Sequence, residues 1–436
     1  MTIPPLAGSK DIVKRNELAA RLNLAAQVEH DILCQYIFAA ASLKQWVEEG
    51  GVTYEQLQVV RRWKGTILGI ARQEMEHLGI VSNLLTAMGE APRFDRPDFP
   101  VAKAELGLDQ DSSLEPFSDA TLLRFLRFEV PQVPLVKDLA YLQKRMPGFT
   151  VKANDAIADL YTGIWKLLGE VDPKGLFIGP VSAEFLTGGN SVSARGRALP
   201  GQEPESITIY GMNIPAVTTV EQAQDAVVQI IREGEGGQDH LSTSHFALFL
   251  AMDRELQDLR SKDPAFAPAR NVVVNPSSTA RPGATVITNP ATRQVVELFD
   301  LSYAVMMQMI IRMYAHSDES AGQISALESV AFFPLMTTVI RPLSDLLTLL
   351  PAFGAMDLER AGPTFAFGRR LDLVPHRRAA WLNIGQQLAL LDELARSVAG
   401  DKRNPSQLQP RLERVAEQIA RIRMTFDDAM LIPEKP

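Results

Sequence analysis

The sequence has very little cysteine: Cys34 is the single one among 436 residues. An internal disulfide is therefore excluded, and nothing in the composition requires an oxidising compartment. Cys34 stands in an apolar stretch, where we expect a small buried side chain. The N-terminal segment also lacks the uninterrupted apolar core of a signal peptide. The simplest expectation is a cytoplasmic protein.

Concentrated positive charge and long apolar runs are missing too. Lys and Arg number 44 against 52 Asp and Glu, a net charge of −8, and no basic stripe is present. Nucleic acid is not expected as a partner, because binding phosphates needs clustered cations. The most apolar stretch, residues 330–356, is interrupted by Arg341, Asp345 and three prolines. A membrane span needs about 20 apolar residues, so no membrane partner is expected.

Several enzyme signatures are also absent, namely G-x-S-x-G, the Walker loop, G-x-G-x-x-G and C-x-x-C. Each of these places a nucleophile, a phosphate cradle or a thiol pair at a fixed spacing, so those enzyme classes lose their support. What is present is an ordinary globular composition, 46% hydrophobic and 22% charged, rich in helix-forming residues. This composition favours an all-α fold.

Two long helices are predicted at the start of the chain. Apolar residues recur at helical spacing over residues 16–47 and stop at the Glu-Glu-Gly-Gly run of residues 48–51. Thr53 and Gln56 then form a capping box, and the helical pattern continues to Gly89. We expect an antiparallel pair of about nine turns each, as a four-helix bundle requires.

The rest of the chain predicts shorter helices separated by long loop excursions. We expect helices at 118–131, 154–168, from 218 or 219 to the interruption at 233–237, from about 241 onward, and at 291–316, 321–350, 376–398 and 405–428, with short strands around 206–210. Residues 10–262 would then form the bundle. Residues 263–290, rich in proline, would form an irregular connector or lid, and residues 291–436 would pack on the bundle as additional C-terminal helices.

The strongest chemical signal is Glu74-Met-Glu-His77, an E-x-x-H on the second long helix. Residues three apart share a helix face, so Glu74 and His77 can offer an oxygen and a nitrogen to one metal ion. Glu29 stands in an apolar stretch of the first helix, about 22 residues before the turn, while Glu74 stands about as far after it. Antiparallel packing should therefore bring Glu29 and Glu74 to the same height.

These residues also allow interpretations without a metal. A buried unpaired carboxylate is costly, so Glu29 is a metal ligand, an ion-pair partner or a member of a solvated face. Glu74 and His77 could also form a hydrogen-bonded core pair. His30 points about 100° away from Glu29 on a helix, and we expect a supporting role for it.

The other half of the bundle should supply a further carboxylate and histidine. The choices are Glu233 or Glu235, His240 or His245, and Asp159 from the third helix, and of these we favour Glu235 and His245. Neighbouring glycines could let the backbone turn Glu235 inward, or they could simply end a helix. Two tyrosines, Tyr36 and Tyr161, could line the site.

Taken in order, several segments resemble one known family. They are VEHDILCQYIFAAASLK, RQEMEHLGIVSNLLTAMGEAPRF, IADLYTGIW, IIREGEGG, TSHFALF and AGPTFAF, spread over residues 17–367. The chain resembles the ferritin-like family associated with iminophenyl-pyruvate dimer synthase, a region shared with violacein-pathway enzymes that oxidatively couple two tryptophan-derived imines.

The resemblance implies a ferritin-like bundle with metal ligands at Glu29, Glu74 and His77, and it supports Glu235 and His245 as the others. The sequence departs from the family pattern at Ser242, where a carboxylate is expected three residues before the histidine. A site that lacks this ligand could hold one metal ion instead of two.

The resulting hypothesis is an oxidoreductase that uses non-haem iron, as one or two ions, with manganese as the alternative. We expect a small-metabolite substrate, such as an amino-acid-derived imine, and dioxygen as a co-substrate. A non-catalytic binding or scaffold protein, accessory to a biosynthetic pathway, is the competing hypothesis. Residues 376 onward could pack on the bundle or form a homodimer.

Overall fold

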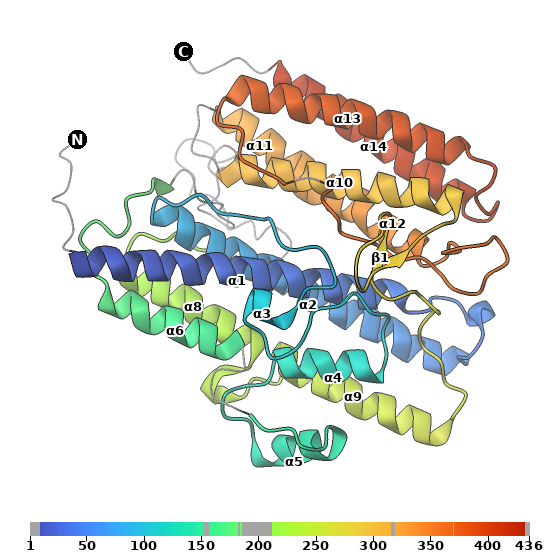
Figure 1. Ribbon diagram of the computed structural model, residues 1–436, viewed down its shortest axis with the longest axis horizontal. Helices are drawn as coiled ribbons and strands as arrows, with labels where there is room; N and C mark the ends of the chain where they lie inside the picture. The colour runs from blue at the N-terminus through green and yellow to red at the C-terminus, as the bar shows by residue number, and fades with distance from the viewer. Residues whose placement is uncertain are drawn as a thin grey trace, which may run out of the picture.

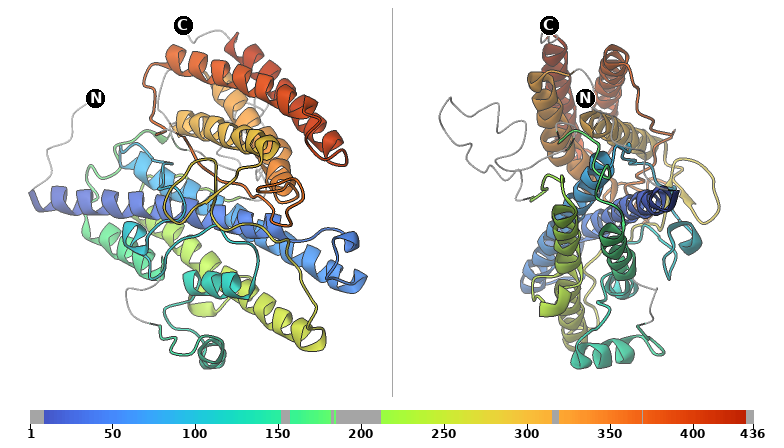
Figure 2. Two further views of the ribbon diagram at one scale, coloured as in Figure 1. Left: turned by 45° about the vertical axis from the view of Figure 1, so that its right-hand side comes forward. Right: turned by 90° about the vertical axis from the view of Figure 1, so that its left-hand side faces the viewer.

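The chain folds into three groups of helices stacked on one another (Figures 1 and 2). The structure is a computed structural model that describes residues 9–151, 157–181, 184, 212–314, 319–368 and 370–431. Helices α1 and α2 lie in the middle, with α4, α6, α8 and α9 on one side and α10 to α14 on the other. The all-α prediction is confirmed. The strands predicted around 206–210 lie outside the described residues.

The middle group is a hairpin of two 34-residue helices, α1 (Ser9–Ser42) and α2 (Tyr54–Ala87). The capping box predicted at Thr53 and Gln56 is present and starts α2. Helix α1 ends five residues before the predicted end, because Leu43 leaves it to pair with Ala269 in an isolated bridge. The chain then reverses through the 3-10 turn η1 (Val47–Glu49) and two glycines with positive φ, Gly50 and Gly51.

The other two helices of the bundle are both interrupted. Two helices form the third one, α4 (Asp119–Phe128) and α6 (Ile157–Glu170), and two form the fourth, α8 (Val220–Gly234) and α9 (His245–Lys262). Helix α6 packs on α1 and α8, while α4 packs on α9 nearer the tip of the hairpin (Figure 1). The interruptions therefore lie beside the middle of α1 and α2.

Local sequence explains where each short helix begins and ends. The side chains of Ser118, Thr219 and Ser244 accept hydrogen bonds from backbone N–H groups at the starts of α4, α8 and α9. Helix α8 ends before Gly236 and Gly237, both at positive φ. These glycines begin a further turn, η5 (Gly237–Asp239), so α9 begins four residues later than the predicted start.

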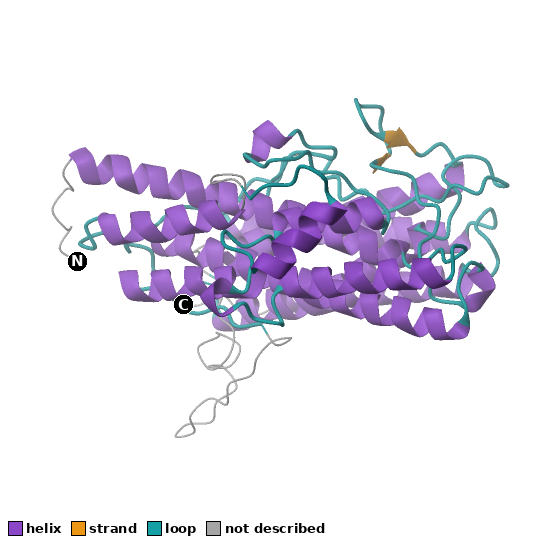
Figure 3. Ribbon diagram, turned by 90° about the horizontal axis from the view of Figure 1, so that it is seen from below, coloured by secondary structure: helices purple, strands orange, loops and turns teal. Residues whose placement is uncertain are grey.

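The chain between bundle and C-terminal helices is irregular, as predicted. It contains one pair of two-residue parallel strands, β1 (Pro276–Ser277) and β2 (Thr285–Val286), seen at the edge of the molecule in Figure 3. Two shorter helices elsewhere, α3 (Lys103–Leu106) and α5 (Val136–Arg145), were not predicted. Both lie in the loop excursions of the bundle.

The C-terminal helices share one apolar core with the bundle. They are α10 (Pro290–Tyr314), α11 (Ala321–Val330), the π-helix η6 (Ala331–Ile340), α12 (Arg341–Leu347), α13 (Arg377–Gly400) and α14 (Gln409–Met430). The prediction of a single helix over 321–350 is wrong, because the structure divides this stretch into α11, η6 and α12. The division lies around Pro334, which has no N–H to continue the α-helical hydrogen bonds. The proposed division at 263 and 291 stays a prediction.

Two described helical stretches are long and apolar enough to cross a membrane by length and composition alone, Pro290–Tyr314 and Gly322–Leu347. In the first, 72% of the apolar window is buried inside the protein. Core helices of water-soluble proteins have the same character, so this signal is weak.

Candidate metal centre

The first part of the site joins the two long helices. Glu29 of α1 and Glu74 and His77 of α2 are all buried. The Nδ1 atom of His77 lies 3.0 Å from Oε2 of Glu74 and 3.5 Å from Oε2 of Glu29. The predicted equal height of Glu29 and Glu74 is therefore observed, and these three side chains could hold one metal ion.

The second part adds residues from the interrupted helices. Nδ1 of His245, the first residue of α9, lies 2.9 Å from Oε1 of Glu74 and 3.5 Å from Oε1 of Glu129. Glu129 caps the C-terminal end of α4. Glu74, Glu129 and His245 could hold a second ion. Glu74 thus presents one oxygen to each group, as a carboxylate bridging two metal ions does.

Both histidines have the same arrangement around the ring. Each turns Nδ1 toward the carboxylates, while Nε2 contacts another polar side chain, Oε2 of Glu233 at 3.1 Å for His77 and Oε1 of Gln73 at 3.2 Å for His245. A partner on the outer nitrogen fixes the tautomer and leaves the inner nitrogen free to bind a metal. The two rings stack with centroids 5.5 Å apart.

Two buried tyrosines hold the carboxylates in position. The hydroxyl of Tyr161 donates a hydrogen bond to Oε1 of Glu29, and that of Tyr36 donates to Oε1 of Glu129. Each tyrosine thereby restricts a carboxylate at the outer edge of one group. Both side chains border the site, as expected from the sequence.

Three carboxyl groups at the site have a raised pKa. Burial, followed by the charge of Glu74, raises the pKa of Glu29 to about 8. Burial also raises the pKa of Glu129, and burial with the charge of Glu129 raises that of Glu235 to about 8. Without a cation these groups therefore resist ionisation, because burial disfavours the charged form and neighbouring negative charges repel one another.

The histidines and Glu74 are shifted in the opposite sense, toward their charged forms. Burial alone would lower the pKa of His245, but the charges of Glu74 and Glu129 raise it to about 9. Burial also opposes the charge on His77, yet its hydrogen bonds to Glu233, Glu29 and Glu74 hold its pKa well above the usual value. Burial likewise opposes ionisation of Glu74, yet His245 and His77 hold its pKa well below the usual range.

The residues present fit a cation. Oε2 of Glu29 and Nδ1 of His245 are buried and have no hydrogen-bond partner of acceptable geometry, although other polar atoms lie near them. An ion in the first group would satisfy Oε2 of Glu29, an ion in the second would satisfy Nδ1 of His245, and either would neutralise carboxylates. Carboxylate oxygens with imidazole nitrogens are the donors that iron and manganese take.

The structure brings together Glu29, Glu74, His77 and His245, four of the five predicted ligands. Glu235 borders the same small cavity but belongs to neither group of candidate ligands. Glu233, which the sequence left open in place of Glu235, contacts His77 from outside. Whether these residues bind metal stays a prediction.

Asp159 and His240, which the sequence also left open as ligands, belong to neither group of candidate ligands. Asp159 accepts a hydrogen bond from Gln132, and His240 is exposed with a left-handed backbone conformation. His30 is buried and hydrogen-bonded to Tyr303 of α10, which agrees with the expected supporting role. Cys34 is buried, as predicted.

Sequence reasoning missed Glu129. A signal for it existed: the helix beginning after Ser118 had to end near Pro131, so Glu129 would occupy its last turn. The third bundle helix was predicted over residues 154–168 only, whereas α4 and α6 together form it. Glu129 is the further carboxylate expected from the other half of the bundle, whereas position 242, three residues before His245, is still occupied by a serine.

Comparisons with known proteins agree with this architecture. Residues 22–254 match the model of the ferritin-like family. Over 374 residues the chain is 30% identical to 2-imino-3-(indol-3-yl)propanoate dimerase of Chromobacterium violaceum, covering 80% of this chain and 34% of that protein. Over 441 residues it is 26% identical to dichlorochromopyrrolate synthase of Lentzea aerocolonigenes, and the match covers 94% of this chain and 41% of that protein.

Among solved structures, a ferritin-like protein from Caulobacter vibrioides aligns with 83% of this chain and 100% of its own, at a TM-score of 0.44 and 16% identity. The chain spans about a third to two-fifths of the length of the two curated relatives.

Proposed function

Because this chain belongs to the ferritin-like family, we propose that it is a metal-dependent oxidoreductase that uses non-haem iron to oxidise a small metabolite. The observation that carries the proposal is the pair of carboxylate–histidine groups that share Glu74. Two adjacent sites on one bridging carboxylate are suited to redox chemistry with dioxygen. Manganese is the alternative metal, since it takes the same donors.

The substrate class is proposed from the relatives. One is named for a 2-imino acid that carries an indole, and the other for a chromopyrrolate. An amino-acid-derived imine is therefore the first substrate to test. Joining two imine molecules by a new C–C bond would break one C–H bond in each and release two electrons and two protons, which dioxygen would accept to form hydrogen peroxide.

The chain's own residues would each have a distinct task. Glu29 with His77, and Glu129 with His245, would each hold one ion, and Glu74 would hold both. Tyr161 and Tyr36 would fix the outer carboxylates by hydrogen bonds. When bound, iron supplies the Lewis acidity and the redox couple for oxidation.

One observation favours a different function, that of a non-catalytic scaffold with a structural metal site. The cavity beside Glu29, Glu74 and His77 measures only about 20 Å³. This volume admits an ion or a water molecule, whereas an indole imine needs a pocket of several hundred Å³. Catalysis would therefore require the residues that line this cavity to move apart.

The test combines metal content with oxygen consumption. The protein is reconstituted with Fe(II) or Mn(II), desalted and analysed for metal, and oxygen uptake is followed with the imine generated from tryptophan. The Glu74→Gln/His77→Ala variant should bind no metal and consume no oxygen. Glu55→Gln removes an exposed carboxylate from the same helix and should behave like the parent protein.

The outcomes separate the hypotheses. Bound metal with imine-dependent oxygen uptake supports the oxidoreductase. Bound metal without uptake for any imine tested favours the scaffold. A folded protein that takes up neither metal contradicts both proposals.

A further inference from the structure

A second cavity, of about 580 Å³, lies where the bundle meets the C-terminal helices. Five separate segments line it: the loop after α1, helix α2, the connector after α9, the η6–α12 segment and the start of α14. At about 1.5 Å per residue, roughly 20 Å of helix separates Glu29 from the end of α1 next to this cavity. The cavity is therefore separate from the metal centre.

Arginine dominates the lining. The side chains of Arg61, Arg270, Arg341, Arg411 and Arg414 all border the cavity, against a single lining carboxylate, Asp345. This is unexpected in a chain with a net charge of −8. The concentration of positive charge in one concave site calls for a physical explanation.

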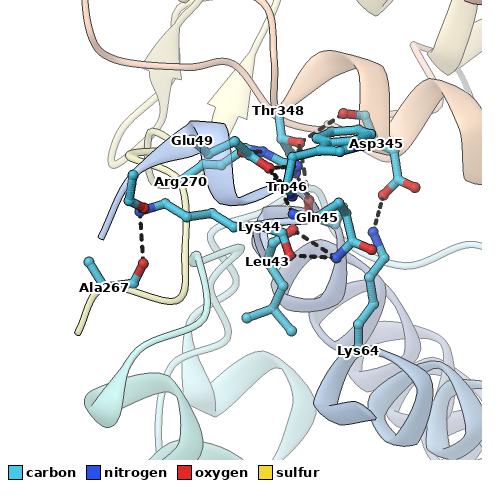
Figure 4. A network of polar contacts seen from close by, with 12 residues as sticks. Leu43, Lys44, Gln45, Trp46, Glu49, Lys64, Ala267, Arg270, Asp345 and Thr348 are labelled. Carbon is cyan, nitrogen blue, oxygen red and sulfur yellow. Dashed lines mark hydrogen bonds and ion pairs between the residues drawn. The ribbon is translucent and has the colours of Figure 1, made fainter. Parts of the chain in front are cut away.

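Two of the lining charges are already neutralised. Arg270 forms a two-pronged ion pair with Glu49, at 2.6 and 3.0 Å, and Asp345 pairs with Lys64 at 2.6 Å. Figure 4 shows both pairs beside Trp46. The charge of the cavity is thus set by the other four arginines.

These four arginines, Arg61, Arg341, Arg411 and Arg414, form no ion pair with any residue that the structure describes. Arg61 donates a hydrogen bond to the backbone carbonyl of Gln45, which positions it without cancelling its charge. The guanidinium of Arg411 lies 4.7 Å from the centre of the Trp46 ring, a contact that also leaves the charge in place.

We propose that this cavity binds a small organic anion that carries two or more acidic groups, either phosphates or carboxylates. Guanidinium groups bind both kinds of oxyanion through paired N–H donors. The volume suits a small molecule, and Trp46, which is 36% exposed, provides a flat wall for an aromatic or apolar part. A bound anion would connect the tip of the hairpin with α12 and α14, and would stabilise that junction.

Calorimetric titration tests the proposal, with pyrophosphate and citrate as the two probes and sodium chloride as the ionic-strength control. At constant ionic strength we expect at least one probe to bind, and Arg414→Gln and Arg341→Gln, both exposed side chains, to weaken Kd about tenfold each, near 1.4 kcal/mol. Arg421→Gln removes an exposed charge from the same helix, α14, outside the cavity. This control should leave Kd unchanged.

Two further measurements show whether the probe binds in this cavity. The probe should change the fluorescence of the parent protein but not of Trp46→Phe, because Trp46 borders the cavity. Binding should also persist in Glu74→Gln/His77→Ala, which excludes an anion held by metal at the other site. Preference for pyrophosphate or citrate distinguishes phosphate from carboxylate ligands. The proposal is overturned if neither probe binds better than chloride, or if Arg421→Gln weakens binding as much as Arg414→Gln.

Discussion

The two halves of the metal centre are built in different ways. Glu29, Glu74 and His77 stand in the interiors of two continuous 34-residue helices. Glu129 and His245 stand at helix ends, one at the cap of α4 and the other at the first residue of α9. Helix interiors are held by hydrogen bonds on both sides, whereas helix ends depend on caps and neighbouring contacts. The first half should therefore be the more rigid.

The largest effect should come from the residue common to both halves. Glu74→Ala removes an oxygen from each group of ligands, and we expect nearly complete loss of bound metal. Elemental analysis of the reconstituted protein measures this. Retention of a full complement of metal would show that Glu74 is not a ligand.

Removing one outer carboxylate should show whether the two groups of ligands bind metal independently. Glu29→Gln affects only the group with His77, and Glu129→Gln only the group with His245. If two ions bind, each variant should keep about one, and the double variant should keep fewer than either single variant. Equal and complete loss in both single variants would mean that the two halves form one indivisible site.

The pH dependence of the metal-free protein follows from the raised pKa values. The pKa of His245 is about 9 in the folded protein and 6.5 in the unfolded chain. Its protonation therefore stabilises the fold in full below pH 6.5, and this contribution is lost as the pH rises through 9. Glu29, whose pKa is raised from 4.5 to about 8, also lowers folding stability as the pH rises between these two values, because its charged form is disfavoured in the folded protein. Urea unfolding should show that the free energy of unfolding falls by about a few kcal/mol between pH 6.5 and 9.

Two controls sharpen the pH experiment. His245→Gln should flatten the dependence above pH 7, because the titrating imidazole is gone. Bound metal should flatten it too, since it displaces the protons. Metal-free parent protein that becomes more stable from pH 6.5 to 9 would contradict these assignments.

The hydroxyl of each tyrosine should matter less than a ligand does. Tyr161→Phe and Tyr36→Phe remove the hydrogen bonds to Glu29 and Glu129, and we expect metal affinity to fall about 10–100-fold. Competition with a chromogenic chelator measures it. If the less rigid half depends more on outside support, Tyr36→Phe should have the larger effect.

The smallest effect compares two helix caps. Ser244→Ala and Thr53→Ala each remove a capping oxygen and should each cost about 1 kcal/mol of folding stability by urea unfolding. Only Ser244 directly precedes a proposed ligand, so only Ser244→Ala should also weaken metal binding. Equal affinities in the two variants would remove the distinction between the halves.

The contrast also explains which parts of the fold were predictable. Helices α1 and α2 follow from apolar periodicity and the Thr53 capping box, which are local properties. The interrupted helices were harder to identify, because the loop between α4 and α6 separates two segments that together form one bundle helix. Glu129 was missed for this reason, and Glu235 was preferred over residues that lie closer to the histidines.

The sequence by itself determined the all-α fold, the long hairpin and the placing of Glu29 opposite Glu74 and His77, because helical spacing and chain reversal are enough to fix these. Only the tertiary structure decided that Glu129 and His245 complete the site and that four arginines from three separate helices border one cavity. Such contacts join residues remote in sequence. They depend on how helices pack, which apolar burial sets across the whole chain and no local pattern records.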